Sequence, residues 1–85
     1  MIVYYVYVLL GKDDRKFYIG YTNDLERRIK EHKLGKVRST NERGVVDLMF
    51  YEAFASKLDA KRRERYFKTT KGRATLKLML RETLV

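Results

Sequence analysis

Apolar and polar positions along the chain follow two patterns, one typical of strands and one typical of helices. Residues 2–10 form an apolar run rich in valine, isoleucine and tyrosine, which are residue types that favour β-strands. The turn-forming residues 11–14 separate this run from a second strand-like segment at residues 16–21, and this arrangement predicts a hairpin. A third strand is predicted over residues 46–54.

Helical patterns follow the hairpin and the third strand. Residues 22–24 supply N-cap candidates for a helix that ends near Lys33. Ser56 and Asp59 resemble a capping box, and they begin a second helix that ends near residue 68. After a break at residues 69–72, a third helix is expected from about Arg73. It runs to about Leu84 and places four apolar side chains on one face, namely Leu76, Met79, Leu80 and Leu84.

The predicted order of elements is β-β-α-β-α-α. This order defines an α+β fold with a small three-stranded antiparallel sheet flanked by helices. Eighty-five residues are enough for one hydrophobic core, and the chain contains no proline and no linker-like stretch. We therefore expect residues 1–85 to form a single domain, with a basic loop over residues 33–45.

The hairpin is expected to bring two tyrosines together. A four-residue turn over residues 11–14 sets a register in which Tyr7 lies directly opposite Tyr18. Tyr5 shares their face, because alternate residues of a strand point to the same side. The phenol groups would then project from one face, although tyrosines in strands often only cover a sheet.

The first predicted helix carries an arginine and the chain's only histidine. Leu25 and Ile29 mark its buried stripe, and Arg28 and His32 lie one turn apart on the flank of that stripe. Arginine can form paired hydrogen bonds with a phosphate, and histidine can relay a proton near neutral pH. Alternatively, His32 is a helix-end residue that interacts with the last carbonyl groups of the helix.

A carboxylate on the second helix is the candidate metal ligand. Glu64 lies close to the apolar side of this helix, which Ala60 and Phe67 define. Magnesium often takes only one or two carboxylates from a protein and fills its other positions with water and substrate phosphate. The alternative is a salt-bridged surface residue, because Glu64 lies within the charged run of residues 61–65.

The composition favours an anionic partner and a reducing compartment. Lysine and arginine total 20 against 11 acidic residues, which gives a net charge of +9 and favours nucleic acid over an anionic membrane surface. The chain has no cysteine, which excludes disulfides and thiolate metal sites and fits a cytoplasmic protein. The apolar run at residues 2–10 is too short to span a bilayer, so no membrane partner is expected.

The sequences Tyr5-Val6-Tyr7 and Tyr18-Ile19-Gly20 resemble the two signatures of the GIY-YIG nuclease family. Residues 20–28 resemble the family's pattern of glycine, threonine, leucine and arginine. His32 follows one turn after the arginine, as in several members, and Glu64 lies on the later helix where the family keeps its metal-binding glutamate. The resemblance covers nearly the whole chain and points to the short, stand-alone bacterial members.

The resemblance implies a metal-dependent endonuclease that hydrolyses phosphodiester bonds in DNA. Glu64 would bind one Mg²⁺ or Mn²⁺ ion, and Arg28 would stabilise charge on the scissile phosphate. Tyr7 and Tyr18 would position the attacking water and the phosphate. Either a tyrosine or His32 would accept the proton of the water, and the sequence leaves this choice open.

Three positions depart from the family pattern. Tyr5 replaces the first glycine, which is tolerable on a strand because the chemistry belongs to Tyr7. Tyr21 occupies a position where the repair-nuclease branch carries lysine. No asparagine follows Glu64 near the site, as it does in some members. The last two departures put in doubt the specifics of the repair branch and the strength of the activity.

Basic side chains are expected to contact DNA phosphates, or to form an ordinary solvated surface. Longer relatives carry an additional targeting domain, so this chain would select its DNA with its own surface, a homodimer or a protein partner. The expected DNA contacts are Lys33, Lys36, Arg38, Arg43, Arg62 and Arg65.

Two other classes of function compete with the nuclease. One is a nucleic-acid-binding module that kept the fold and lost useful catalysis. The other is a protein-interaction domain that uses Leu78 and Met79 as exposed apolar contacts. The sequence does not distinguish DNA from RNA. The intact set of candidate site residues favours the enzyme, which predicts that these side chains line one shared concave surface.

Overall fold

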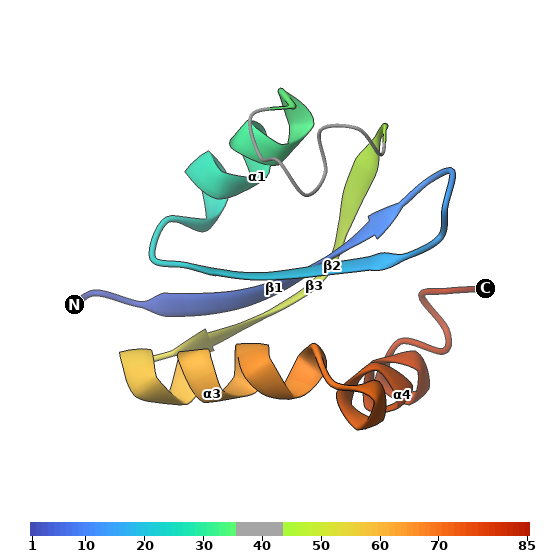
Figure 1. Ribbon diagram of the computed structural model, residues 1–85. Coiled ribbons are helices and arrows are strands. Elements are labelled where there is room, and N and C mark those ends of the chain that lie inside the picture. Colours follow the sequence, from blue (N-terminus) through green and yellow to red (C-terminus); the bar gives the residue numbers. More distant parts are fainter. Residues whose placement is uncertain (36–43) are drawn as a thin grey trace.

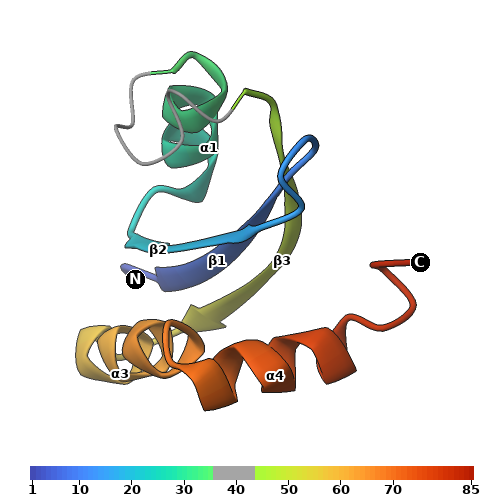
Figure 2. The ribbon, with the colours of Figure 1, turned by 45° about the vertical axis from the view of Figure 1, so that its right-hand side comes forward.

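The computed structural model describes residues 1–35 and 44–85. A three-stranded sheet has one helix on one face and two helices on the other, which confirms the predicted α+β order (Figures 1 and 2). No helix in the described ranges is long and apolar enough to cross a bilayer. The elements are β1 (Tyr4–Gly11), β2 (Phe17–Thr22), α1 (Leu25–Lys33), β3 (Val46–Phe54), α3 (Lys57–Phe67) and α4 (Thr70–Met79).

The middle strand of the sheet is β1, which pairs antiparallel with β2 on one side and with β3 on the other. Alternate residues of β1 therefore point into two hydrophobic cores, one on each face of the sheet. Val6 and Val8 pack with Phe67 and other apolar side chains of α3 and α4. Tyr7 and Leu9 point to the opposite face, where the apolar side of α1 covers them. Because β2 is an edge strand, its outer side pairs with no other strand of this sheet.

The register of the hairpin differs from the predicted one by two residues. Tyr7 is opposite Gly20, and Tyr18 is opposite Leu9, so the expected direct pairing of Tyr7 with Tyr18 is wrong. The four-residue turn lies one position later than predicted, over residues 12–15, because the Gly11 N–H donates to the Lys16 carbonyl at 3.0 Å. A shift of two residues preserves the face of every side chain. The two tyrosines therefore still share a face, but as diagonal neighbours.

The third helix begins and ends earlier than predicted. Thr69 is its N-cap, and the Thr69 hydroxyl accepts a hydrogen bond from the Gly72 N–H at 3.0 Å, so the helix starts at Thr70 and ends at Met79. Glycine is needed inside this helix because a Cβ atom at Gly72 would collide with the carbonyl of Tyr66. The predicted apolar face also requires correction, since Met79 is 41% exposed. The other three predicted members lie at the core: Leu76, Leu80 and Leu84.

The other helix starts match the capping signals in the sequence. Asp24 caps α1 by accepting a hydrogen bond from the Arg27 N–H at 3.2 Å. Ser56 caps α3 by accepting from the Asp59 N–H at 3.4 Å. The cap of α1 fixes where that helix leaves β2, and it thereby sets which α1 side chains face the sheet.

Candidate active site

A cleft of about 480 Å³ lies beside the edge strand β2 and collects side chains from the sheet and from all three described helices. The sheet contributes residues of β1 and β2, and the helical layers on both faces contribute His32 and the charged side chains. The five candidate catalytic and metal-binding residues all line this cleft, which meets the geometric expectation of one shared concave surface. They are Tyr7, Tyr18, Arg28, His32 and Glu64.

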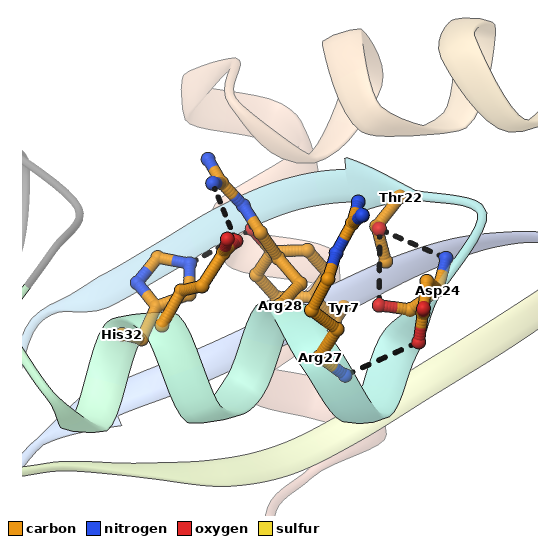
Figure 3. A network of polar contacts seen from close by, with 7 residues as sticks. Tyr7, Thr22, Asp24, Arg27, Arg28 and His32 are labelled. Atoms are coloured by element: carbon orange, nitrogen blue, oxygen red, sulfur yellow. Dashed lines mark hydrogen bonds and ion pairs between the residues drawn. The ribbon is translucent and has the colours of Figure 1, made fainter.

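The centre of the cleft wall is a hydrogen-bonded group of three side chains (Figure 3). The Tyr7 hydroxyl lies 2.9 Å from His32 Nε2, and Arg28 Nε donates to the same hydroxyl at 3.3 Å. Tyr7 is 2% exposed and His32 is 6% exposed. Arg28 also donates through Nη1 to Glu31 at 3.2 Å. The guanidinium is thus held between a phenol and a carboxylate.

The protons in this group can be assigned from the donors and acceptors. Arginine can only donate, so the Tyr7 oxygen accepts from Arg28 and its own proton is directed to His32 Nε2. His32 can accept it because burial, together with the nearby charge of Arg28, lowers its pKa to about 4 and keeps the imidazole neutral. Burial also raises the pKa of Tyr7, although Arg28 opposes this rise. The resting pair is therefore a neutral phenol and a neutral imidazole.

The ring of His32 contacts the central strand from the last turn of α1. Its Nε2 bonds to the Tyr7 hydroxyl, so this nitrogen does not interact with the last carbonyl groups of the helix. The end of α1 is satisfied by backbone groups, since the Leu34 and Gly35 N–H groups donate to the Lys30 and His32 carbonyls.

Gly20 gives the Tyr7 ring its place in the cleft. Gly20 is the cross-strand partner of Tyr7, and a Cβ atom there would collide with the Tyr7 hydroxyl and ring. Any larger residue would push the phenol away from His32. Gly20 of the second signature is therefore required because its position is in contact with Tyr7 of the first signature.

Tyr18 is held by an acidic residue of the hairpin turn. The Tyr18 hydroxyl donates to Asp14 Oδ2 at 2.5 Å, and Asp14 Oδ1 accepts from the Lys16 N–H at 3.0 Å. Sequence reasoning missed Asp14 because it took residues 11–14 only as turn chemistry. The spacing of four residues between Asp14 and Tyr18 identifies the pair only when the position of the turn is known.

Glu64 reaches the cleft from α3. Its side chain is 15% exposed, and Lys68 Nζ lies 3.2 Å from Glu64 Oε2. Arg73 also lines the cleft, and its guanidinium donates to the Phe17 carbonyl at 3.4 Å. Sequence reasoning missed both basic residues. The i,i+4 spacing from Glu64 could have indicated Lys68, whereas the position of Arg73 depends on how α4 packs against α3.

The donor set of the cleft fits a hard cation with few protein ligands. No group of three or more histidine, cysteine, aspartate or glutamate side chains with metal-binding geometry occurs in residues 1–35 and 44–85. Glu64 is the one carboxylate among the described lining residues. A Mg²⁺ ion that keeps its waters and binds a substrate phosphate needs no more than this from the protein.

The three expected DNA contacts among the described residues do not line the cleft. Lys33, Arg62 and Arg65 are exposed, and none of them lines it. Arg62 forms an ion pair with Asp59 at 3.0 Å, on a side of α3 that points away from Glu64. Three further expected contacts lie outside the described residues: Lys36, Arg38 and Arg43.

Comparison with known proteins defines the class of this fold and site. Residues 3–77 match the family model of the GIY-YIG catalytic domain. The chain therefore belongs to the GIY-YIG family, whose domain is of the nuclease type.

Similar proteins are short bacterial proteins. A UPF0213 protein of Clostridium perfringens is 42% identical, and the match covers 88% of this chain and 81% of the relative. A UPF0213 protein of Staphylococcus haemolyticus is 40% identical over 93% of this chain and 96% of its own length. The solution NMR structure of a UPF0213 protein from Bacillus halodurans is 38% identical, with a TM-score of 0.57 and coverage of 91% of this chain and 84% of that one.

Proposed function

We propose that this protein is a metal-dependent endonuclease that hydrolyses phosphodiester bonds in DNA. The observation that carries the proposal is the convergence of the Tyr7, His32 and Arg28 group with Glu64 in one cleft. These side chains come from both faces of the sheet and meet beside its edge strand. Phosphodiester hydrolysis needs a group that stabilises the charge of the phosphate, a proton acceptor and a ligand for the cation.

The cation would be Mg²⁺ or Mn²⁺, held by Glu64. Bound there, it would polarise the scissile phosphate and stabilise the negative charge of the leaving oxygen. Arg28 would donate to the phosphate from the opposite wall of the cleft, because Tyr7 and Glu31 already fix the direction of its guanidinium. Arginine suits this role because its planar fork matches phosphate oxygens.

Tyr7 and His32 would share the proton of the attacking water. The water oxygen forms the new bond to phosphorus, and the bond to the leaving oxygen breaks. The Tyr7 oxygen takes the proton of the water as the Tyr7 proton passes to His32 Nε2 along their hydrogen bond. The low pKa of His32 makes the imidazolium short-lived, so it returns the proton to Tyr7 as Tyr7 releases the proton of the water to solvent, and the leaving oxygen takes up a proton from solvent. An anionic phosphate in the cleft favours the imidazolium while it exists.

Cleavage of defined DNA forms tests the proposal. Duplex, single-stranded, flapped and branched DNA would each be incubated with Mg²⁺, with Mn²⁺ or with a chelator. We expect metal-dependent nicking that Glu64→Ala abolishes while DNA binding survives. Asp59→Ala is the matched control, because Asp59 is an exposed acidic residue of the same helix that pairs with Arg62. Its cleavage should equal that of the wild type.

Two outcomes would redirect the proposal. Undiminished cleavage by Glu64→Ala would remove Glu64 as the cation ligand. Binding without cleavage on every DNA form and with either metal would favour the non-catalytic nucleic-acid-binding module. A monomer with one such site would nick one strand, so a double-strand cut would indicate a homodimer on the DNA.

A further inference from the structure

A second hollow, of about 690 Å³, lies next to the catalytic cleft. The two share a wall that Phe17, Tyr18 and Arg73 form. The second hollow extends from this wall between the end of the β1–β2 hairpin, α4 and the segment that follows α4. In the ribbon this segment turns from the end of α4 back toward the hairpin (Figure 1). The hollow therefore adjoins the cleft along the edge strand.

The lining of this second hollow is strongly basic. It contains five cationic side chains and, among the described residues that line it, no acidic one. Arg73, Lys77 and Arg81 follow one another at intervals of four residues, which puts the first two on one side of α4 and the third just beyond its end. Arg15 and Lys16 face them from the hairpin turn. Such a lining favours the binding of a polyanion.

Hydrogen bonds hold two of these arginines in place around the hollow. Arg15 donates through Nη2 to the Leu84 carbonyl at 3.4 Å, which ties the hairpin turn to the segment after α4. Arg81 donates through Nη1 to the Leu78 carbonyl at 2.8 Å. The nearby Asp14 carboxylate bonds to the Tyr18 hydroxyl and the Lys16 N–H. The walls of the hollow are therefore linked to each other by contacts within the protein.

The lining of the hollow also contains apolar and aromatic side chains. Leu10, Phe17 and Leu84 contribute to it, together with the ring of Tyr18. A DNA duplex offers phosphates and sugars on its outside and keeps its bases stacked within. A nucleotide with an unpaired base offers a flat ring and a phosphate together, which matches a lining of aromatic and basic side chains.

We propose that this hollow binds an unpaired nucleotide of the DNA strand that occupies the catalytic cleft. Its base lies against Phe17 and Tyr18, and its phosphates contact Lys77 and Arg81. This inference rests on the proposed endonuclease function and deepens it. The preferred substrate is DNA in which an unpaired segment adjoins the scissile phosphate, rather than a continuous duplex.

Equilibrium binding in chelator tests the inference without cleavage. Fluorescence anisotropy would compare a blunt duplex with the same duplex carrying a short single-stranded tail. The test variant is Lys77→Ala/Arg81→Ala, and the control is Lys30→Ala/Lys57→Ala. All four residues are exposed, and each double variant lowers the net charge of +9 by two. Neither control residue lines the cleft or the hollow.

The wild type should bind the tailed duplex about tenfold more tightly than the blunt one, which equals about 1.4 kcal/mol. The test variant should lose this preference, and the control should keep it. For the tailed DNA, the slope of log affinity against log salt should become shallower by about 1.4 in the test variant, as expected for two lost contacts to a single strand. A 2-aminopurine in the tail should be quenched by the wild type and less so by the test variant.

Equal losses in the two double variants would overturn the inference, because net charge alone would then explain binding. Absence of any preference for the tail in the wild type would also overturn it. Failure of the endonuclease proposal gives a different result, namely a lasting tail preference without cleavage of any DNA. Metal-dependent cleavage that is equal for blunt and tailed DNA would keep the endonuclease and remove the unpaired-nucleotide site.

Discussion

The Tyr7 hydroxyl lies 2.9 Å from His32 Nε2, and this buried contact joins the central strand to the end of α1. The same Tyr7 ring packs in the core beneath α1 and lines the cleft. Folding and site formation are therefore coupled, because α1 cannot leave the sheet without breaking the candidate proton pathway. Changes at this contact should affect both stability and cleavage.

Protonation of His32 should destabilise the protein in mild acid. The unfolded chain gains this proton below a pH of about 6.5, whereas the folded protein resists it down to a pH of about 4. The free energy of unfolding should therefore fall as the pH drops through this window, by about 2 kcal/mol at a pH of about 5. Urea unfolding of the wild type and of His32→Gln at both neutral and acidic pH measures this fall in the free energy of unfolding. An equal fall in the two proteins would contradict the prediction.

Gly20→Ala should damage the site through Tyr7. The added Cβ atom would collide with the Tyr7 hydroxyl and ring, so the ring must move. We expect a loss of about 1–3 kcal/mol in stability, as for overpacked cores, and a loss of cleavage. Gly72→Ala is the matched control, because it collides with the Tyr66 carbonyl between α3 and α4. It should destabilise the fold and leave the NMR signals of the His32 ring unchanged, whereas Gly20→Ala should shift them.

Arg28→Lys should show whether cleavage depends on the charge of Arg28 alone or also on the geometry of its guanidinium. Lysine keeps the positive charge but cannot hold the Tyr7 hydroxyl and Glu31 at once with a planar fork. The rate of cleavage should fall by about 10²–10³, the range seen when one transition-state donor is removed. DNA affinity should change little. Arg27→Lys, at an exposed neighbouring position, should cleave at the wild-type rate, and a near-normal rate for Arg28→Lys would show that charge alone suffices.

Lys68→Ala should lower the Mg²⁺ concentration that cleavage requires. Lys68 Nζ lies 3.2 Å from Glu64 and competes with a cation for that carboxylate. With the amine removed, half-maximal cleavage at saturating DNA should require less Mg²⁺, by roughly fivefold if the ion pair contributes about 1 kcal/mol. Arg65→Ala, an exposed position on the same helix, should leave the Mg²⁺ requirement unchanged. An unchanged requirement in Lys68→Ala would show that the ion pair does not limit metal binding.

Much of the fold followed from local patterns. The three strands, the first helix and the second helix were predicted closely because their apolar periodicity and capping residues act within a few residues of chain. The third helix was misplaced because Gly72 reads as a helix breaker. Glycine is accepted inside α4 because α4 packs closely on α3 at this residue, and the sequence pattern around Gly72 does not predict that packing.

The candidate site was predictable only in part for the same reason. Helical spacing put Arg28 beside His32, and strand alternation put Tyr7 and Tyr18 on one face, because both rules depend on backbone geometry alone. The sequence could not show that His32 Nε2 contacts the Tyr7 hydroxyl. That outcome depends on where α1 lies on the sheet. Asp14 and Arg73 were missed because their contacts depend on the position of the turn and on helix packing.

The sequence by itself determined which side chains face which way along each strand and helix, and that a basic surface accompanies them. Only the tertiary structure decided that Gly20, and not Tyr18, lies opposite Tyr7. It also decided that β2 is an edge strand, so that Glu64 from one face can share a cleft with Arg28 from the other. Strand order and register arise from pairing and packing over long distances in the chain, and local propensity does not report on either.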